Sequence, residues 1–137
     1  MFNDSIFIKK VVELEIEVQS LAYGGMGLAK VDEFVVFVKN GIPGQRLLVL
    51  IYKKKKGFAE ARIIKVLKQS PLATEARCDH YWICSKLQTL SYEEQLKEKE
   101  KQVVDAFQRI GGFTDFTING VRSAENKYNY RNKMEFT

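Results

Sequence analysis

The segment VVELEIEVQ at residues 11–19 places the tightest limit on how this chain can fold. Apolar Leu14, Ile16 and Val18 alternate with glutamates along it. Successive side chains of a β-strand point to opposite faces, so a period of two is typical of a strand with one buried face. The segment therefore predicts a half-buried strand whose outer face is acidic.

Further short β-type segments follow, separated by turn residues. They are FVVFV at 34–38, RLLVLIY at 46–52 and FAEARIIKVL at 58–67. The last would also suit a helix, but the strand before it needs a partner across a short turn. Glycines 24, 25 and 27 and the sequence NGIPG at 40–44 mark turns or bulges, because glycine tolerates positive φ.

About five short strands joined by glycine-rich turns predict a small closed barrel of the OB type over residues 1–68. Residues 69–90 form a linker and a loop containing Cys78 and Cys84. Residues 91–137 follow as a helix and one or more strands. The predicted class is mainly β with one long helix (α+β), in which a five-stranded barrel precedes part of an α+β central domain.

The helix is predicted from residue 91 to the glycine pair at 111–112. Ser91 and Glu94 have capping-box spacing, and a glycine pair is typical of a helix end. An apolar face is formed by Tyr92, Leu96, Val103, Phe107 and Ile110. Residues 128–136 alternate again and predict a strand that reaches the end of the chain without a turn or cap. We therefore expect a truncated piece of a longer protein.

The net charge of +5 comes entirely from residues 1–70, which carry 12 Lys and Arg against 7 Asp and Glu. Between Lys39 and Lys68 the only acid is Glu60. This excess indicates a polyanionic partner, or alternatively a solvated lysine surface. With two cysteines, no long apolar run and no leader pattern, we expect a cytoplasmic protein that spans no membrane.

The sequence YGGMGLA at 23–29, the strand residues Phe37 and Val38, Pro43-Gly44 and Lys54-Lys55 resemble the TRAM domain, a small RNA-binding barrel. The resemblance covers about residues 8–68, with Gln45 where an acid is usual.

An RNA-binding barrel implies roles for particular side chains. Arg46 and the lysines Lys53, Lys54, Lys55 and Lys56 would contact phosphates, and Tyr23 or Phe58 would stack on a base. The glycines would let RNA approach the backbone. Phe37 lies in an apolar run and is assigned to the core.

The sequence from Cys78 to Gln88, with the helix that ends in Arg109-Ile110-Gly111, resembles the segment after the TRAM domain in RNA 5-methyluridine methyltransferases. Many members hold an iron–sulfur cluster there, which takes four thiolates. Cys78 and Cys84 keep the spacing of two ligands, but Leu87 occupies the third position. Even with His80 as a substitute ligand the set is incomplete, so we expect vestigial cluster positions and no cluster.

The resemblance places catalysis in a Rossmann-like domain that binds S-adenosylmethionine and supplies a nucleophilic cysteine, and no such unit is evident here. We therefore expect the RNA-binding N-terminal region of an S-adenosylmethionine-dependent methyltransferase acting on uridine C5 of 23S rRNA or tRNA. Alone, the chain is expected to be inactive; the catalytic domain of the same polypeptide would be its partner. The alternatives are a stand-alone RNA-binding adaptor and a metal- or redox-sensing loop.

Overall fold

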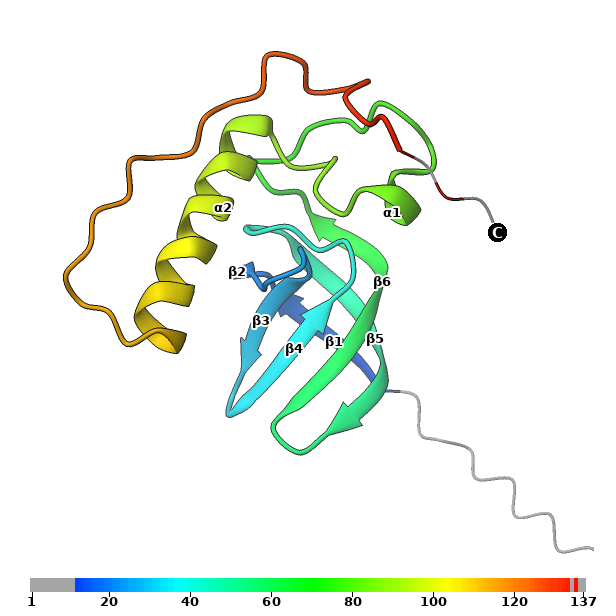
Figure 1. The fold of residues 1–137 in the computed structure, drawn as a ribbon. Coiled ribbons are helices and arrows are strands. Elements are labelled where there is room, and N and C mark those ends of the chain that lie inside the picture. Colours follow the sequence, from blue (N-terminus) through cyan, green and yellow to red (C-terminus); the bar gives the residue numbers. More distant parts are fainter. Residues whose placement is uncertain (1–11, 134, 136–137) are drawn as a thin grey trace, which may run out of the picture. The chain divides into compact units, whose positions relative to one another are not determined.

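The computed structural model describes residues 12–133 and 135, with only the backbone of Cys84 (Figure 1). The chain divides into two compact units, Met1–Gln95 and Leu96–Thr137. Among the described residues, no helix is long and apolar enough to cross a membrane. The first unit contains every strand of the described residues and forms the body of the fold.

Six strands form one sheet in the first unit. They are β1 (Val12–Glu17), β2 (Ser20–Leu21), β3 (Gly27–Val31), β4 (Phe34–Val38), β5 (Arg46–Lys55) and β6 (Phe58–Lys68). Their order across the sheet is β1-β5-β6-β4-β3-β2. All neighbours are antiparallel except β4 and β6, which are parallel.

The first strand passes from one edge of the sheet to the other at Val18 and Gln19. β1 pairs with β5, whereas β2 pairs with β3. Between them, the Val18 amide donates to the carbonyl of Gln45 at 2.9 Å, and the Gln19 amide donates to the carbonyl of Leu28 at 2.8 Å. Because β1 and β2 are the two ends of the strand order, this switch closes the sheet into a barrel.

Six strands occur where about five were predicted, because Ser20–Leu21, which lies beyond the strand predicted at residues 11–19, pairs with β3 as β2. The predicted alternation is confirmed: Ile16 and Val18 are buried, while the glutamates between the apolar residues face outwards and are exposed. Apolar side chains from β1, β3, β4, β5 and β6 complete the interior. Gly27 is required at the closure, because a Cβ there would lie 2.7 Å from the carbonyl oxygen of Gly41.

A second apolar cluster fastens the loop after β6 to the outside of the barrel. Leu21, Ile42 and Leu90 are buried together, and Leu72 and Leu87 pack against them. The loop therefore belongs structurally to the barrel, although the sequence suggested a separate linker over residues 69–90.

Gln45 joins the turn after β4 to the end of β6. Its side-chain oxygen accepts a bond from the Ile42 amide at 3.0 Å, and its side-chain nitrogen donates to Gln69 Oε1 at 2.8 Å. Gln69 Oε1 also accepts from the Ser70 amide, and the Ser70 hydroxyl donates to the carbonyl of Pro43 at 2.6 Å. Gln45 and Ser70 are the buried polar residues of this region, and both are hydrogen-bonded.

The helix α2 (Tyr92–Asp105) begins in the last residues of the first unit, and in the second unit it leads into one π-helical turn, Ala106–Ile110. The predicted stop at the glycine pair is confirmed, because the helical hydrogen bonds end with the Gly111 amide. Phe107 lies 5.8 Å from Phe113 and 5.3 Å from Phe116 between ring centroids.

The strand predicted over residues 128–136 is wrong where it is described: residues 128–133 and 135 have no regular structure. A strand needs a neighbour for its backbone N–H and C=O groups. No strand is found among the described residues of the second unit, so the alternating pattern has nothing to pair with.

We predict that Gln45→Glu destabilises the barrel by about 1–3 kcal/mol. The new carboxylate can still accept the hydrogen bond from the Ile42 amide, but its second oxygen replaces the amide nitrogen that donates to Gln69 Oε1, so two acceptors then face each other. Thermal or urea unfolding of the full chain measures this. Gln19→Glu, the same change of charge on an exposed side chain, is the control and should stay within about 0.5 kcal/mol of the wild type. Equal stability of both variants would refute the role of Gln45.

Candidate nucleic-acid interface

The outer face of β4 and β6 carries a row of large side chains. Val36 and Val38 of β4 and Ala59 and Ala61 of β6 are buried, so the residues that alternate with them point away from the core. The outward residues are Val35 and Phe37 on β4, and Phe58, Glu60 and Arg62 on β6. The parallel register pairs Val35 with Phe58 and Phe37 with Glu60.

Phe37 and Phe58 form an aromatic pair on this outer face. Their ring centroids are 5.8 Å apart and their planes meet at 75°, an edge-to-face arrangement. Both side chains are only partly buried. Phe37 was assigned to the core from its apolar neighbours; the alternation with Val36 and Val38 instead places it outside, beside the residue chosen as a base platform.

The lysine run at residues 53–56 lies mostly within a strand. Lys53, Lys54 and Lys55 belong to β5, and only Lys56 and Gly57 form the turn, with Gly57 at φ 89°. Lys54 Nζ lies 5.0 Å from the ring centre of Phe34, and Lys55 Nζ lies 5.9 Å from that of Phe58. Lys55 thus borders the aromatic pair, whereas Lys54, which pairs with buried Ala59, lies on the other side of the sheet.

Lys53 differs from the other three lysines because an acid neutralises it. Its Nζ lies 2.5 Å from Glu60 Oε1, and the Tyr52 hydroxyl donates to Glu60 Oε2 at 3.1 Å. Within the described part of the chain, Lys54, Lys55 and Lys56 make no ion pair. The latter three are the better candidates for phosphate contacts.

The pairing with Lys53 also changes how Glu60 titrates. The hydrogen bond from Lys53, helped by that from Tyr52, lowers the pKa of Glu60 below its ordinary value of 4.5 against an opposing effect of desolvation. The hydrogen bond to Glu60 likewise raises the pKa of Lys53. Burial, followed by the bond to Glu60, raises the pKa of Tyr52.

Arg46 and Tyr23 lie away from the aromatic pair. Arg46 begins β5 and forms an ion pair with Glu15 of β1, so its charge is neutralised. Nine residues of extended strand separate Arg46 from Lys55, about 30 Å. Tyr23 is 92% exposed in the turn between β2 and β3, which lies at the Val38 end of β4. The predicted RNA-binding residues therefore do not form a single cluster.

The glycines beside Tyr23 were expected to let RNA approach the backbone, and only one of the two has the open space for this. Gly24 and Gly25 adopt positive φ, which makes the tight turn possible. Gly24 has open space, but Gly25 is buried, and a Cβ there would meet Lys86 and Leu87 at 3.4 Å. Lys86 also donates to the carbonyl of Gly24 at 3.2 Å. The segment that lies close to the backbone of Gly25 is thus the cysteine loop of the same chain.

The residues of the cysteine loop do not fit an iron–sulfur cluster. Cys78 is exposed, and Gln88 Oε1 accepts bonds from the amides of Arg77 and Cys78 at 2.7 and 3.2 Å. Leu87, at the position of a third ligand, packs in the second apolar cluster. Among the described side chains, which do not include that of Cys84, no three His, Cys, Asp or Glu residues are grouped as metal ligands. The loop is held by packing and by Gln88.

Comparisons with known proteins agree with this arrangement. Residues 8–64 match the model of the TRAM domain. A protein of Bacillus cereus named as an uncharacterized RNA methyltransferase is 41% identical over 93% of this chain and 28% of its own length. A Clostridium tetani protein with the same name is 37% identical over 95% of this chain and 29% of its own length.

The chain thus spans less than a third of the curated relatives it matches. Among solved structures, a conserved protein of Methanococcus maripaludis is 31% identical over 47% of this chain and 100% of its own length. Its TM-score of 0.38 is too low to add to the assignment of the fold.

We predict that Lys53→Ala raises the pKa of Glu60 toward 4.5, because the hydrogen bond that favours the ionised carboxylate is lost. In the wild type this pair stabilises the fold above the ordinary pKa of Glu60, and the contribution disappears as pH falls through its lowered pKa. An NMR titration of the Glu60 carboxyl group measures the shift. Lys56→Ala, which removes a neighbouring charge from the turn, should leave the pKa unchanged; equal shifts in both variants would contradict the pairing.

Proposed function

We propose that this chain, in which residues 8–64 are a TRAM domain, is the RNA-binding N-terminal region of an RNA methyltransferase. The observation that carries the proposal is the Phe37–Phe58 pair on the outer face of the barrel, bordered by Lys55, which makes no ion pair with a described residue. Aromatic faces and nearby cations are what a barrel of this kind needs to hold single-stranded nucleic acid.

The ion pairs separate the cations that are free to contact phosphates from those that already have a carboxylate partner. Phosphate contacts are assigned to Lys54, Lys55 and Lys56, whose charges are available to a polyanion. Lys53 and Arg46 contribute less, because binding RNA would require each to leave a carboxylate. Base stacking is assigned to Phe58 and Phe37, and Tyr23 provides a separate exposed ring at the other end of β4.

The finer assignment is methylation of uridine C5 in 23S rRNA or tRNA, with S-adenosylmethionine as methyl donor. The residues described here do not fit that donor: Gly24, Gly25 and Gly27 lie in and beside a turn between two antiparallel strands, not between a strand and a helix. Binding of the donor and attack on the ring are therefore assigned to another part of the full-length enzyme. A module that grips RNA helps to offset the unstacking of the target base.

The second unit supports a region of a larger enzyme over a stand-alone adaptor. No residue of α2 is buried, and Ile110 in the following turn is 88% exposed. Val103 and Phe107 are 42% and 44% exposed. Exposed apolar side chains gathered along one helix favour a surface that another part of a larger protein covers.

We predict that the affinity for single-stranded RNA falls steeply with salt, and that Lys55→Ala reduces the slope of log K against log salt by about 0.7. Lys53→Ala should change the slope much less, because Glu60 already neutralises that lysine. Fluorescence anisotropy of a labelled oligoribonucleotide measures both.

Lys101→Ala, an exposed lysine of α2, is the control and should leave the slope unchanged. Equal effects of Lys53→Ala and Lys55→Ala would refute the division of the cations. RNA binding that is insensitive to salt would refute the proposed interface.

A further inference from the structure

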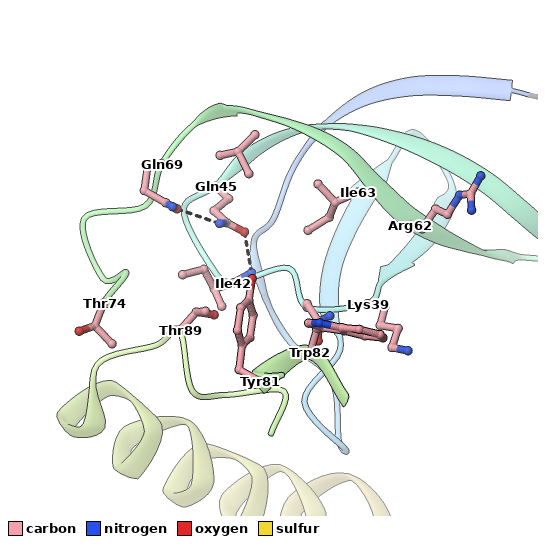
Figure 2. Close-up of a pocket in the computed structure, with 12 residues that line it drawn as sticks. Lys39, Ile42, Gln45, Arg62, Ile63, Gln69, Thr74, Tyr81, Trp82 and Thr89 are labelled. Carbon is pink, nitrogen blue, oxygen red and sulfur yellow. Dashed lines mark hydrogen bonds between the residues drawn. The ribbon is translucent and has the colours of Figure 1, made fainter. Parts of the chain in front are cut away.

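A pocket of about 430 Å³ lies between the barrel and the cysteine loop, entirely within the first unit (Figure 2). Its barrel side comes from the end of β4, the turn that follows it, and β6. Its other side comes from α1 (Tyr81–Cys84) and the segments around Thr74 and Thr89. The volume is within the range of pockets that hold a small ligand.

The charged groups of this pocket are all positive. Lys39 and Arg62 line it, and no Asp or Glu does. Neither cation makes an ion pair with any described residue, in contrast to Arg46 and Lys53. The Lys39 amide donates to the carbonyl of Ala61 at 3.3 Å, which ties the two basic positions together through the backbone. The site therefore favours an anionic ligand.

Two aromatic side chains enter the pocket from α1. Figure 2 shows Trp82 on the side of Lys39, and Tyr81 on the side of Gln45 and Thr89. Trp82 is 49% exposed, so one part of the indole is open to a ligand. The helix is held in place by the packing of Leu87 and by the bond from Lys86 to Gly24.

The pocket continues the outer face that carries the aromatic pair. Lys39 lies two residues beyond Phe37, just after the end of β4, and Arg62 lies four residues beyond Phe58 on the same side of β6. A strand of RNA lying on Phe58 and Phe37 would therefore lead toward Lys39 and Arg62.

From these features we infer that the pocket binds one unstacked nucleotide of the RNA, with its base against Trp82 and its phosphates at Lys39 and Arg62. This inference rests on the proposed function, because the nucleotide belongs to the RNA bound on the aromatic face. The pocket recognises a single base, whereas the aromatic face contacts the RNA backbone and stacks on bases.

Trp82 is the only tryptophan of the chain, so its fluorescence reports on this pocket alone. The full chain is titrated with an oligouridylate and an oligoadenylate of about 12 nucleotides, each end-labelled for anisotropy. A ribose-phosphate oligomer of the same length without bases is the control. At least one RNA should quench or shift the tryptophan emission in parallel with binding, while the abasic oligomer should bind through its phosphates and leave the emission unchanged.

Substitutions then separate the pocket from the rest of the interface. Trp82→Ala should weaken RNA binding by about 5- to 100-fold, and Trp82→Phe should restore most of it, because the ring still stacks. Ile83→Ala, the next residue of α1, is 64% exposed and lies outside the pocket, so it should bind as the wild type does. Arg62→Ala should reduce the salt slope, whereas Lys65→Ala, an exposed lysine of the same strand outside the pocket, should reduce it less.

The outcomes distinguish the two proposals. RNA that binds, by anisotropy, without any change in tryptophan emission and with equal affinity for Trp82→Ala would overturn the pocket and leave the RNA-binding function standing. Equal emission changes with the abasic oligomer would also overturn it, since no base would be involved. Failure of all oligomers to bind would reject the proposed function itself, and the pocket with it.

Discussion

The passage of the first strand between two partners is the constraint on which the rest of the fold depends. Val18 bonds to the backbone of Gly44 and Gln45 on one side, and Gln19 bonds to Leu28 on the other. Three backbone hydrogen bonds thus close the sheet, and closure removes the exposed edges that such short strands would otherwise present. Closure also gives β4 and β6 an inner and an outer side, and the aromatic pair lies on the outer side.

Acidic residues decide which parts of a basic surface remain available. Glu15 and Glu60 each neutralise one cation, and both of those cations had been expected to contact phosphates. Lys55, which lies beside Phe58, and Lys39 and Arg62, which line the pocket that contains Trp82, make no ion pair with a described residue. Net charge alone therefore does not show which cations are available, because the cross-strand ion pairs decide that.

The strands could be predicted from the sequence because their signals are local. The segment at 34–38 has the predicted bounds, and the turn at 40–44 is confirmed. The ion pairs, the outward direction of Phe37 and the pocket could not be predicted, because each depends on the register between distant strands or on how the cysteine loop packs. The strand predicted near the C-terminus failed for a related reason: alternation describes a face, but a strand also needs a neighbour.

The most direct test is an NMR titration of the isotopically labelled chain with a single-stranded oligoribonucleotide, following the backbone amides. We expect the largest changes in amide chemical shift on β4, β6 and the turn at Lys56, extending to Lys39 and the α1 segment. The acidic outer face of β1, around Glu13 and Glu15, should remain unchanged. Shift changes centred on β1 or on the second unit, or none at all, would contradict an RNA-binding face on β4 and β6.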